Sequence, residues 1–202
     1  MPLWLADRPL LLASKSEIRR AILVAAGVPV EVAPADIDER AIEQAAASRD
    51  AGEIAALLAR AKSQVIAARL PGRLVLGADQ TLALGETRFS KPADRAAARD
   101  QLQALRGRTH ELHTAIALAR DGAIVFEHRE IARLTMRAFS DGFLESYLDA
   151  MGEAVSASVG GYQLEKAGVQ LFERIAGDHF VILGLPLMAL LDYLRRAGCL
   201  SQ

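Results

Sequence analysis

Cysteine is almost absent from this chain, which has one, Cys199, among its 202 residues. A single thiol excludes an intrachain disulfide and a metal site built from several cysteines. Histidines are few as well, and His110 and His113, three residues apart in a strand-like segment, would point to opposite faces. We therefore expect these two histidines, together with His128 and His179, to be structural or exposed rather than metal ligands.

Long apolar runs and an excess of one charge are also missing. No run approaches the roughly 20 residues that span a bilayer, and Asp7, Arg8 and Pro9 interrupt the first apolar residues, so we expect no signal peptide and a cytoplasmic protein. The formal net charge is −1, whereas proteins that bind duplex nucleic acid usually carry a basic surplus. Neither a membrane nor a duplex is therefore an expected partner.

What the chain does have is apolar content for a core. Apolar residues make up 51% of the sequence, which excludes general disorder. The length suits one domain, or two small lobes around a cleft, and we treat residues 1–202 as a single domain.

Strand-like, helix-like and hairpin-like segments follow one another, as is typical of an α/β domain with a mixed sheet. Helical periodicity predicts helices at 16–26, 54–70, 93–105, 140–150 and from 186 onwards. Apolar runs predict strands at 9–13, 28–32, 73–78 and 81–84, and alternation around Asp121-Gly122 predicts a hairpin over 109–137. Residues 35–50 are expected to be a loop running into a helix, and residues 152–162 a loop.

Two polar residues, Asp79 and Gln80, interrupt the apolar stretch LVLGADQTLAL at 74–84. A buried carboxylate is costly unless something pairs with it. At the end of a strand, Asp79 could hold a metal ion or orient an attacking water. Gln80 has donors and an acceptor, so it could read a base edge or bond a ribose. The alternative is a turn in which Asp79 accepts from nearby N–H groups.

The stretch LASKSEIRR at 12–20 could bind an anion, because a strand ends there and a helix begins. Ser14 or Ser16 could cap the helix, and Arg19 or Arg20 could form a fork onto phosphate oxygens. The alternative is simple capping beside a solvated basic face. Arginines early in a helix oppose its dipole, which favours an anionic partner.

Two further segments carry charged candidates. Asp36, Asp38 and Glu39 could coordinate Mg²⁺ or Mn²⁺ through oxygen, or form a solvated acidic loop. Lys91 precedes Pro92, which favours an extended backbone, so its side chain could project towards a phosphate or remain a surface lysine.

Taken in order, these motifs resemble the Maf family of nucleoside triphosphate pyrophosphatases. The resemblance covers nearly the whole chain, and the order and spacing of the motifs together are specific. The matching segments are Leu12-Ala13-Ser14-Lys15-Ser16 with Arg19, Ile37-Asp38-Glu39, Ala61-Lys62, Gly77-Ala78-Asp79-Gln80, Lys91-Pro92, Leu105 to Gly107, Thr114, and Gly184-Leu185-Pro186-Leu187.

The resemblance implies a two-lobed Maf/ITPase-like α/β fold, with a central mixed, twisted sheet flanked by helices and a cleft between the lobes. It implies hydrolysis of a nucleoside triphosphate to the monophosphate and pyrophosphate with a divalent cation, Mg²⁺ or Mn²⁺, and it leaves a homodimer open. Asp79 then resembles the catalytic acid that activates water, and Glu39 its acidic partner at the metal. The residues that resemble the family's phosphate-handling residues are Ser14, Arg19, Lys62 and Lys91.

One difference from the family pattern concerns which nucleobase the substrate carries. Members that hydrolyse thymidine and uridine triphosphates carry Arg, Thr and Gln at the positions that are here Ile18, Gln80 and Glu165. Gln80 and Glu165 are instead similar to the branch acting on 7-methyl-GTP, and a carboxylate can accept from both N–H donors on the guanine edge. A guanine-type substrate is therefore expected. Broad hydrolysis of several modified nucleotides, or a nucleotide-binding role in septum formation, remain alternatives, as do a surface position for Glu165 and simple packing for Ile18.

Overall fold

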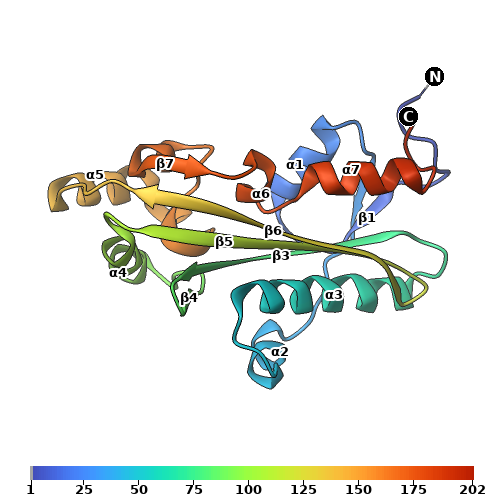
Figure 1. The fold of residues 1–202 in the computed structure, drawn as a ribbon, viewed down its shortest axis with the longest axis horizontal. Coiled ribbons are helices and arrows are strands. Elements are labelled where there is room, and N and C mark those ends of the chain that lie inside the picture. The colour runs from blue at the N-terminus through green and yellow to red at the C-terminus, as the bar shows by residue number, and fades with distance from the viewer. Residues whose placement is uncertain (1) are drawn as a thin grey trace. The chain divides into compact units, whose positions relative to one another are not determined.

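The computed structural model describes residues 2–202, and the chain forms two compact units. The first unit contains the chain up to Gln80, Thr114–Glu130 and His179–Gln202, and the second contains Thr81–His113 and Ile131–Asp178. Both units contain strands and helices, so the predicted α/β class with a mixed sheet is confirmed (Figure 1). Three strands contribute residues to both units: β3 (Val75–Leu84), β5 (Thr109–Arg120) and β6 (Ala123–Met136).

The first unit is built on strands in the order β2-β1-β3-β5-β6. Strand β1 (Leu10–Leu12) lies between β2 (Val30–Val32) and β3 and pairs in parallel with both. Strands β5 and β6 are joined by the predicted two-residue turn, Asp121-Gly122. Strand β1 has a parallel neighbour on each side and is buried at all of its positions, which explains why its residues are apolar throughout.

Helices cover both faces of this part of the sheet (Figure 1). Leu10, Leu12, Leu76 and Ala78 belong to a core shared with α1 (Glu17–Ala25) and α7 (Leu187–Arg196). The alternate residues Leu11, Ala13 and Val75 pack with Ile66 and Ala67 of α3 (Ala51–Arg69). Successive residues of a strand point to opposite faces, so the parity of a position in β3 decides which helices its side chain meets.

Gly77 lets α3 approach β3 very closely. A Cβ atom at this position would lie 2.1 Å from the carbonyl oxygen of Ala59 and 2.8 Å from the amide nitrogen of Ser63. Both are main-chain atoms of α3, so a side chain at position 77 cannot be accommodated by a rotamer change. The absence of a side chain at Gly77 therefore sets the distance between the helix that carries Lys62 and the strand that carries Asp79.

Strand β3 runs without interruption from Val75 to Leu84. The prediction of a break at Asp79 and Gln80, and with it the alternative of a turn there, is wrong. The backbone hydrogen bonds of a ladder outweigh the low strand propensity of an aspartate when both sides of the strand are buried. Three segments were also not predicted: the strands β4 (Thr87–Phe89) and β7 (Phe172–Ala176) and the short helix α6 (His179–Ile182).

The second unit contains the later part of β3, which pairs antiparallel with β4 (Thr87–Phe89), and the end of β6, which pairs antiparallel with β7. Its two longer helices are α4 (Arg95–Leu105) and α5 (Asp141–Met151), both close to the predicted ranges. Between α5 and β7 lie three short 3₁₀ turns: η1 (Gly152–Ser156), η2 (Val159–Gly161) and η3 (Ala167–Leu171).

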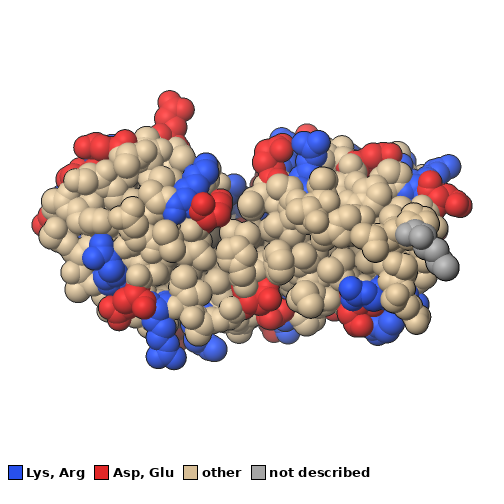
Figure 2. All heavy atoms as spheres, turned by 90° about the horizontal axis from the view of Figure 1, so that it is seen from above, with Lys and Arg blue, Asp and Glu red and all other residues tan. Residues whose placement is uncertain are grey.

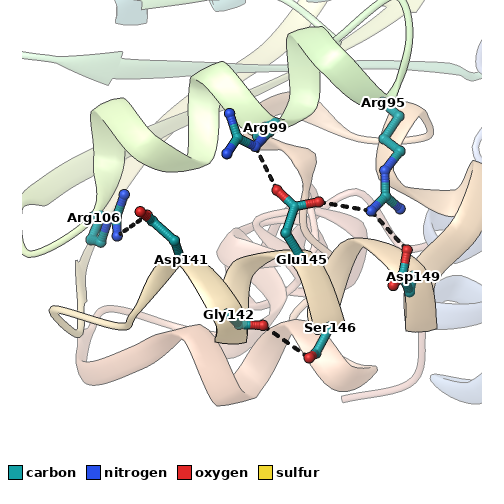
Figure 3. Close-up of polar contacts among 8 residues, drawn as sticks. All are labelled: Arg95, Arg99, Arg106, Asp141, Gly142, Glu145, Ser146 and Asp149. Carbon is teal, nitrogen blue, oxygen red and sulfur yellow. Dashed lines mark hydrogen bonds and ion pairs between the residues drawn. The ribbon is translucent and has the colours of Figure 1, made fainter.

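A row of ion pairs joins α4 to α5 (Figure 3). Glu145 accepts from Arg99 at 2.5 Å and from Arg95 at 3.0 Å, while Arg106 reaches Asp141 at 2.8 Å. The bonds from Arg99 and Arg95 lower the pKa of Glu145. The exposed fractions of these side chains run from 25% for Arg106 to 71% for Asp141, so water screens the pairs and each adds little stability.

Charged groups of both signs are interspersed on the face drawn in Figure 2. Over the described residues visible there, no continuous basic area forms, in keeping with the net charge of −1. Among residues 2–202, none of the helices combines the length and the apolar character that crossing a bilayer demands.

His110 is fully buried in the second unit, and burial lowers its pKa to about 4. Its Nε2 lies 2.7 Å from the hydroxyl of Tyr162. Because an unfolded histidine titrates near 6.5, the unfolded chain binds more protons than the folded chain between about pH 6.5 and 4. We expect the free energy of unfolding to fall by about 3 kcal/mol as the pH drops through this window.

Denaturant unfolding followed from pH 7 to 4 measures this effect. His110→Gln keeps a polar partner for Tyr162 but does not titrate, so it should flatten the fall, whereas the same change at half-exposed His128 serves as the control. A pH dependence that is identical in wild type and His110→Gln would contradict the assignment.

Candidate functional site

The first element of the site is the junction between β1 and α1. Ser16 is the N-cap of α1, and its hydroxyl accepts from the main-chain nitrogen of Arg19 at 3.4 Å. Ser14 Oγ accepts from the main-chain nitrogen of Ser16 at 3.2 Å. Of the two predicted caps, Ser16 is therefore the cap and Ser14 orders the approach to it. The free N–H groups of a helix start favour an anion at this point.

The side chain of Arg19 turns back towards the sheet and is held by main-chain oxygens. Its Nε donates to the carbonyl of Gly184 at 2.7 Å, and its Nη1 donates to the carbonyl of Ala78 at 3.0 Å and to Ser14 Oγ at 3.3 Å. Gly184 has φ +91°, and a Cβ there would lie 3.2 Å from Nη2. Arg19 is thus the arginine held in a fixed direction, whereas Arg20 is exposed and pairs with Glu17.

Lys62 lies between two carboxylates. Its ammonium group is 2.6 Å from Asp79 Oδ1 and 2.9 Å from Glu39 Oε1. The side chains of Lys62 and Asp79 are only 10% and 12% exposed, whereas that of Glu39 is 50% exposed. Asp79 shares its strand face with Val75 and Gly77, and α3 covers that face, so strand parity brings the acid to the lysine.

Burial and charge act in opposite directions on Asp79. Burial raises the pKa of Asp79 above its ordinary value, and the positive charges of Lys62 and Arg19 oppose the rise. Burial likewise lowers the pKa of Arg19, against the attraction of Asp79 and Glu39. A buried carboxylate whose pKa is raised accepts a proton more readily than an exposed one, which suits a general base.

Gln80 points to the opposite face of β3 from Asp79, towards α6. Its Nε2 donates to Thr114 Oγ1 at 2.9 Å and to the carbonyls of Val181 and Ile182 at 3.0 and 3.1 Å. The amide nitrogen is therefore used within the chain. The predicted contact of Gln80 with a base or ribose stays a prediction.

Ile18 packs against the core that α1 and α7 share. This position agrees with simple packing, one of the two roles that the sequence left open. The acids at 36–39 also separate: Asp38 caps α2 (Glu39–Ala45) by accepting from the main chain of Ala41 at 2.9 Å, and Glu39 alone reaches Lys62.

Two predicted site residues, Lys91 and Glu165, belong to the second unit. Lys91 is exposed in the segment between β4 and α4. Glu165 is exposed between η2 and η3, and its negative charge adds to the effect of burial in raising the pKa of Tyr147. Their share in the site formed by Ser14, Arg19 and Asp79 stays a prediction.

Sequence reasoning missed the roles of Thr114 and Gly184. Thr114 is buried, accepts from Gln80 and donates to the carbonyl of Val181 at 2.9 Å. A hydroxyl in the otherwise apolar stretch TAIALA was the available signal, because a buried polar group needs partners. Nothing in the sequence points to the bond between Gly184 and Arg19, which are 165 residues apart.

An α/β unit that brings together a buried carboxylate from the middle of a strand, a lysine from a long helix and a fixed arginine near the start of another helix is equipped to handle phosphorylated substrates. The sequence assigns it further: residues 9–197 match the family described as Maf-like protein, and the chain belongs to the Maf family.

Proteins similar to this chain carry informative names. A "Nucleoside triphosphate pyrophosphatase" of Rhodopseudomonas palustris (strain BisB18) is 55% identical over 100% of both chains. A "7-methyl-GTP pyrophosphatase" of Mesorhizobium japonicum is 49% identical over 95% of this chain and 98% of its own. A solved HAM1 protein from Coxiella burnetii is 18% identical, with a TM-score of 0.44 over 65% of this chain and 74% of that one.

Proposed function

We propose that this protein hydrolyses a guanine-type nucleoside triphosphate to the monophosphate and pyrophosphate, with water attacking the α-phosphorus and a divalent cation assisting. Membership of the family supports the activity itself. Maf relatives that match the whole chain are named nucleoside triphosphate pyrophosphatases, and this chain is one of these hydrolases.

The observation that carries the proposal is the buried carboxylate of Asp79 held beside Lys62 and near Arg19. Asp79 would accept the proton of the attacking water, since burial raises its pKa. The proton then resides on Asp79, the bond between the α-phosphorus and the bridging oxygen breaks, and pyrophosphate leaves. Lys62, Arg19 and the N–H groups at the start of α1 would offset the charge on the phosphate oxygens.

The carboxylates that meet at Lys62 also fit a divalent cation. Glu39 Oε1 and Asp79 Oδ1 come from different elements and both lie within 2.9 Å of one ammonium nitrogen. Within residues 2–202, no three side chains of His, Cys, Asp or Glu gather as a ligand group, and Mg²⁺ commonly uses one or two carboxylates together with substrate phosphates and water. Glu39 and Asp79 would hold the cation, which supplies positive charge to the phosphates when bound.

The preference for guanine rests on Glu165. An exposed carboxylate accepts hydrogen bonds only, so it would match the two adjacent N–H donors of the guanine edge and oppose the carbonyls of thymine and uracil. The relative named for 7-methyl-GTP supports this choice.

Pyrophosphate release over a panel of ordinary and modified triphosphates, with Mg²⁺, Mn²⁺ or chelator, tests the proposal. We expect the fastest release from guanine-type substrates. Glu165→Gln should lower the guanine-to-uridine ratio of kcat/KM by about tenfold, because one acceptor becomes a donor. Glu153→Gln, which changes another exposed acid of the second unit, in η1, is the matched control.

The other outcomes separate the alternatives. Activity led by dTTP or UTP would refute the guanine preference but leave the enzyme. Comparable release from many modified nucleotides would favour broad house-cleaning. Nucleotide binding without release from any substrate would favour a regulatory role, such as one in septum formation.

A further inference from the structure

The short helix α6 ends against two side chains from different strands. The last carbonyls of a helix have no partner within the helix. Here the carbonyl of Val181 accepts from Thr114 Oγ1 at 2.9 Å and from Gln80 Nε2 at 3.0 Å, and that of Ile182 accepts from Gln80 Nε2 at 3.1 Å. Gln80 also donates to Thr114, so the two side chains form one bonded pair.

The backbone just beyond this cap holds the arginine of the site. Gly184 follows Ile182 by two residues, and its main-chain nitrogen donates to the carbonyl of Val181 at 3.0 Å. The carbonyl of the same glycine accepts from Arg19 Nε at 2.7 Å. A continuous series of hydrogen bonds therefore runs from Thr114 and Gln80, through the end of α6, to the guanidinium of Arg19.

We propose that Thr114 and Gln80 are positioning residues, which fix the end of α6 so that Gly184 holds the guanidinium of Arg19 in the direction needed for a triphosphate. The need for Arg19 at the phosphates rests on the proposed function. Thr114 is 1% exposed, so its hydroxyl acts through these bonds and not by touching a nucleotide. The inference gives the amide nitrogen of Gln80 an internal role.

The first readout is the Nε–H signal of Arg19 in a proton–nitrogen NMR spectrum, identified by its loss in Arg19→Lys. A hydrogen bond to Gly184 should protect this proton from exchange with water. Thr114→Val keeps the shape of the side chain but loses the hydroxyl, so we expect loss of this protection. Thr114→Ser, which restores the hydroxyl, should recover it.

The second readout is binding of an α,β-methylene analogue of GTP, which resists hydrolysis at the α-phosphorus. Thr114→Val should bind it about tenfold more weakly, the effect of one net hydrogen bond, and Thr114→Ser should bind it as wild type does. Gln80→Met, which keeps the stem and loses the amide, is the second variant and should behave like Thr114→Val. The matched control is Thr135→Val, which loses a 2.9 Å bond to Thr109 that reaches no carbonyl of α6.

The two readouts keep this inference separate from the proposed function. Retained protection of the Arg19 proton in both Thr114→Val and Gln80→Met would overturn the inference, and so would lost protection with unchanged analogue binding. If Thr114→Ser failed to recover either signal, side-chain volume and not the hydroxyl would be responsible. If wild type bound no analogue, the proposed function would fail, and the NMR signal would still decide whether the pair positions Arg19.

Discussion

Replacement of Asp79 by Asn is expected to reduce pyrophosphate release by about 10²- to 10⁴-fold, the usual contribution of a general base. The amide is close in size to the carboxylate but cannot take the proton of the attacking water. Lys62 keeps Glu39 as a partner at 2.9 Å in this variant, so its charge is not left alone in the core. Release from a guanine-type triphosphate, measured beside the melting temperature, is the test.

Binding of a nucleotide analogue, measured in parallel, shows whether Asp79→Asn has lost the chemical step or the ability to bind substrate. If Asp79 acts as the base, the α,β-methylene GTP analogue should still bind to Asp79→Asn while release is lost. Asp141→Asn, which removes the acid of the 2.8 Å pair with Arg106 in the second unit, is the matched control and should release pyrophosphate normally. Undiminished release by Asp79→Asn would rule out Asp79 as the base and direct attention to another acceptor, Glu39 first.

Replacement of Gly77 by Ala is expected to lower the free energy of unfolding by about 3 kcal/mol or more, at or above the upper end for overpacked cores. The added Cβ would lie 2.1 Å from the carbonyl oxygen of Ala59. That oxygen belongs to the main chain of α3, so relief requires movement of the helix as a whole. Such movement would also carry Lys62 away from Asp79, and activity at low temperature should fall together with stability.

Urea unfolding of Gly77→Ala measures the first effect, and Gly142→Ala is an informative control. Gly142 lies in the first turn of α5, where a Cβ would have Ser140 Oγ at 3.9 Å as its nearest neighbour. Alanine there should be neutral or slightly stabilising, within about 1 kcal/mol. Equal unfolding midpoints for Gly77→Ala and wild type would show that α3 and β3 can separate without cost.

Local patterns in the sequence were sufficient for most elements of the fold. The apolar spacing of α1, α3 and α4, and the Asp121-Gly122 turn, each depend on residues that are close along the chain. Asp79 and Gln80 show where the same reasoning went wrong. We interpreted the two polar residues as a break in the strand and therefore allowed a turn. The alternation of a strand, which the sequence also permitted, places their side chains on opposite faces.

The contacts that complete the site depend on distant segments. The bond from Arg19 to Gly184 and the bonds from Gln80 to α6 join positions about 100 or more residues apart. Such contacts cannot be predicted from the positions of the residues in the sequence unless the topology of the fold is already known. The family resemblance supplied Gly184 and Thr114 as matching positions, and the structure supplies what their atoms contact.

The acceptors that direct Arg19 towards the sheet include two main-chain carbonyls, those of Ala78 and Gly184. Every amino acid has a main-chain carbonyl, so a mutation at position 78 changes packing but does not delete the acceptor. The acceptor at position 78 is therefore kept when that residue is mutated. Position 184 is sensitive, because any Cβ there would lie 3.2 Å from Nη2 of Arg19. In a library of random variants, position 184 should accept far fewer residue types than its role as a single loop glycine would suggest.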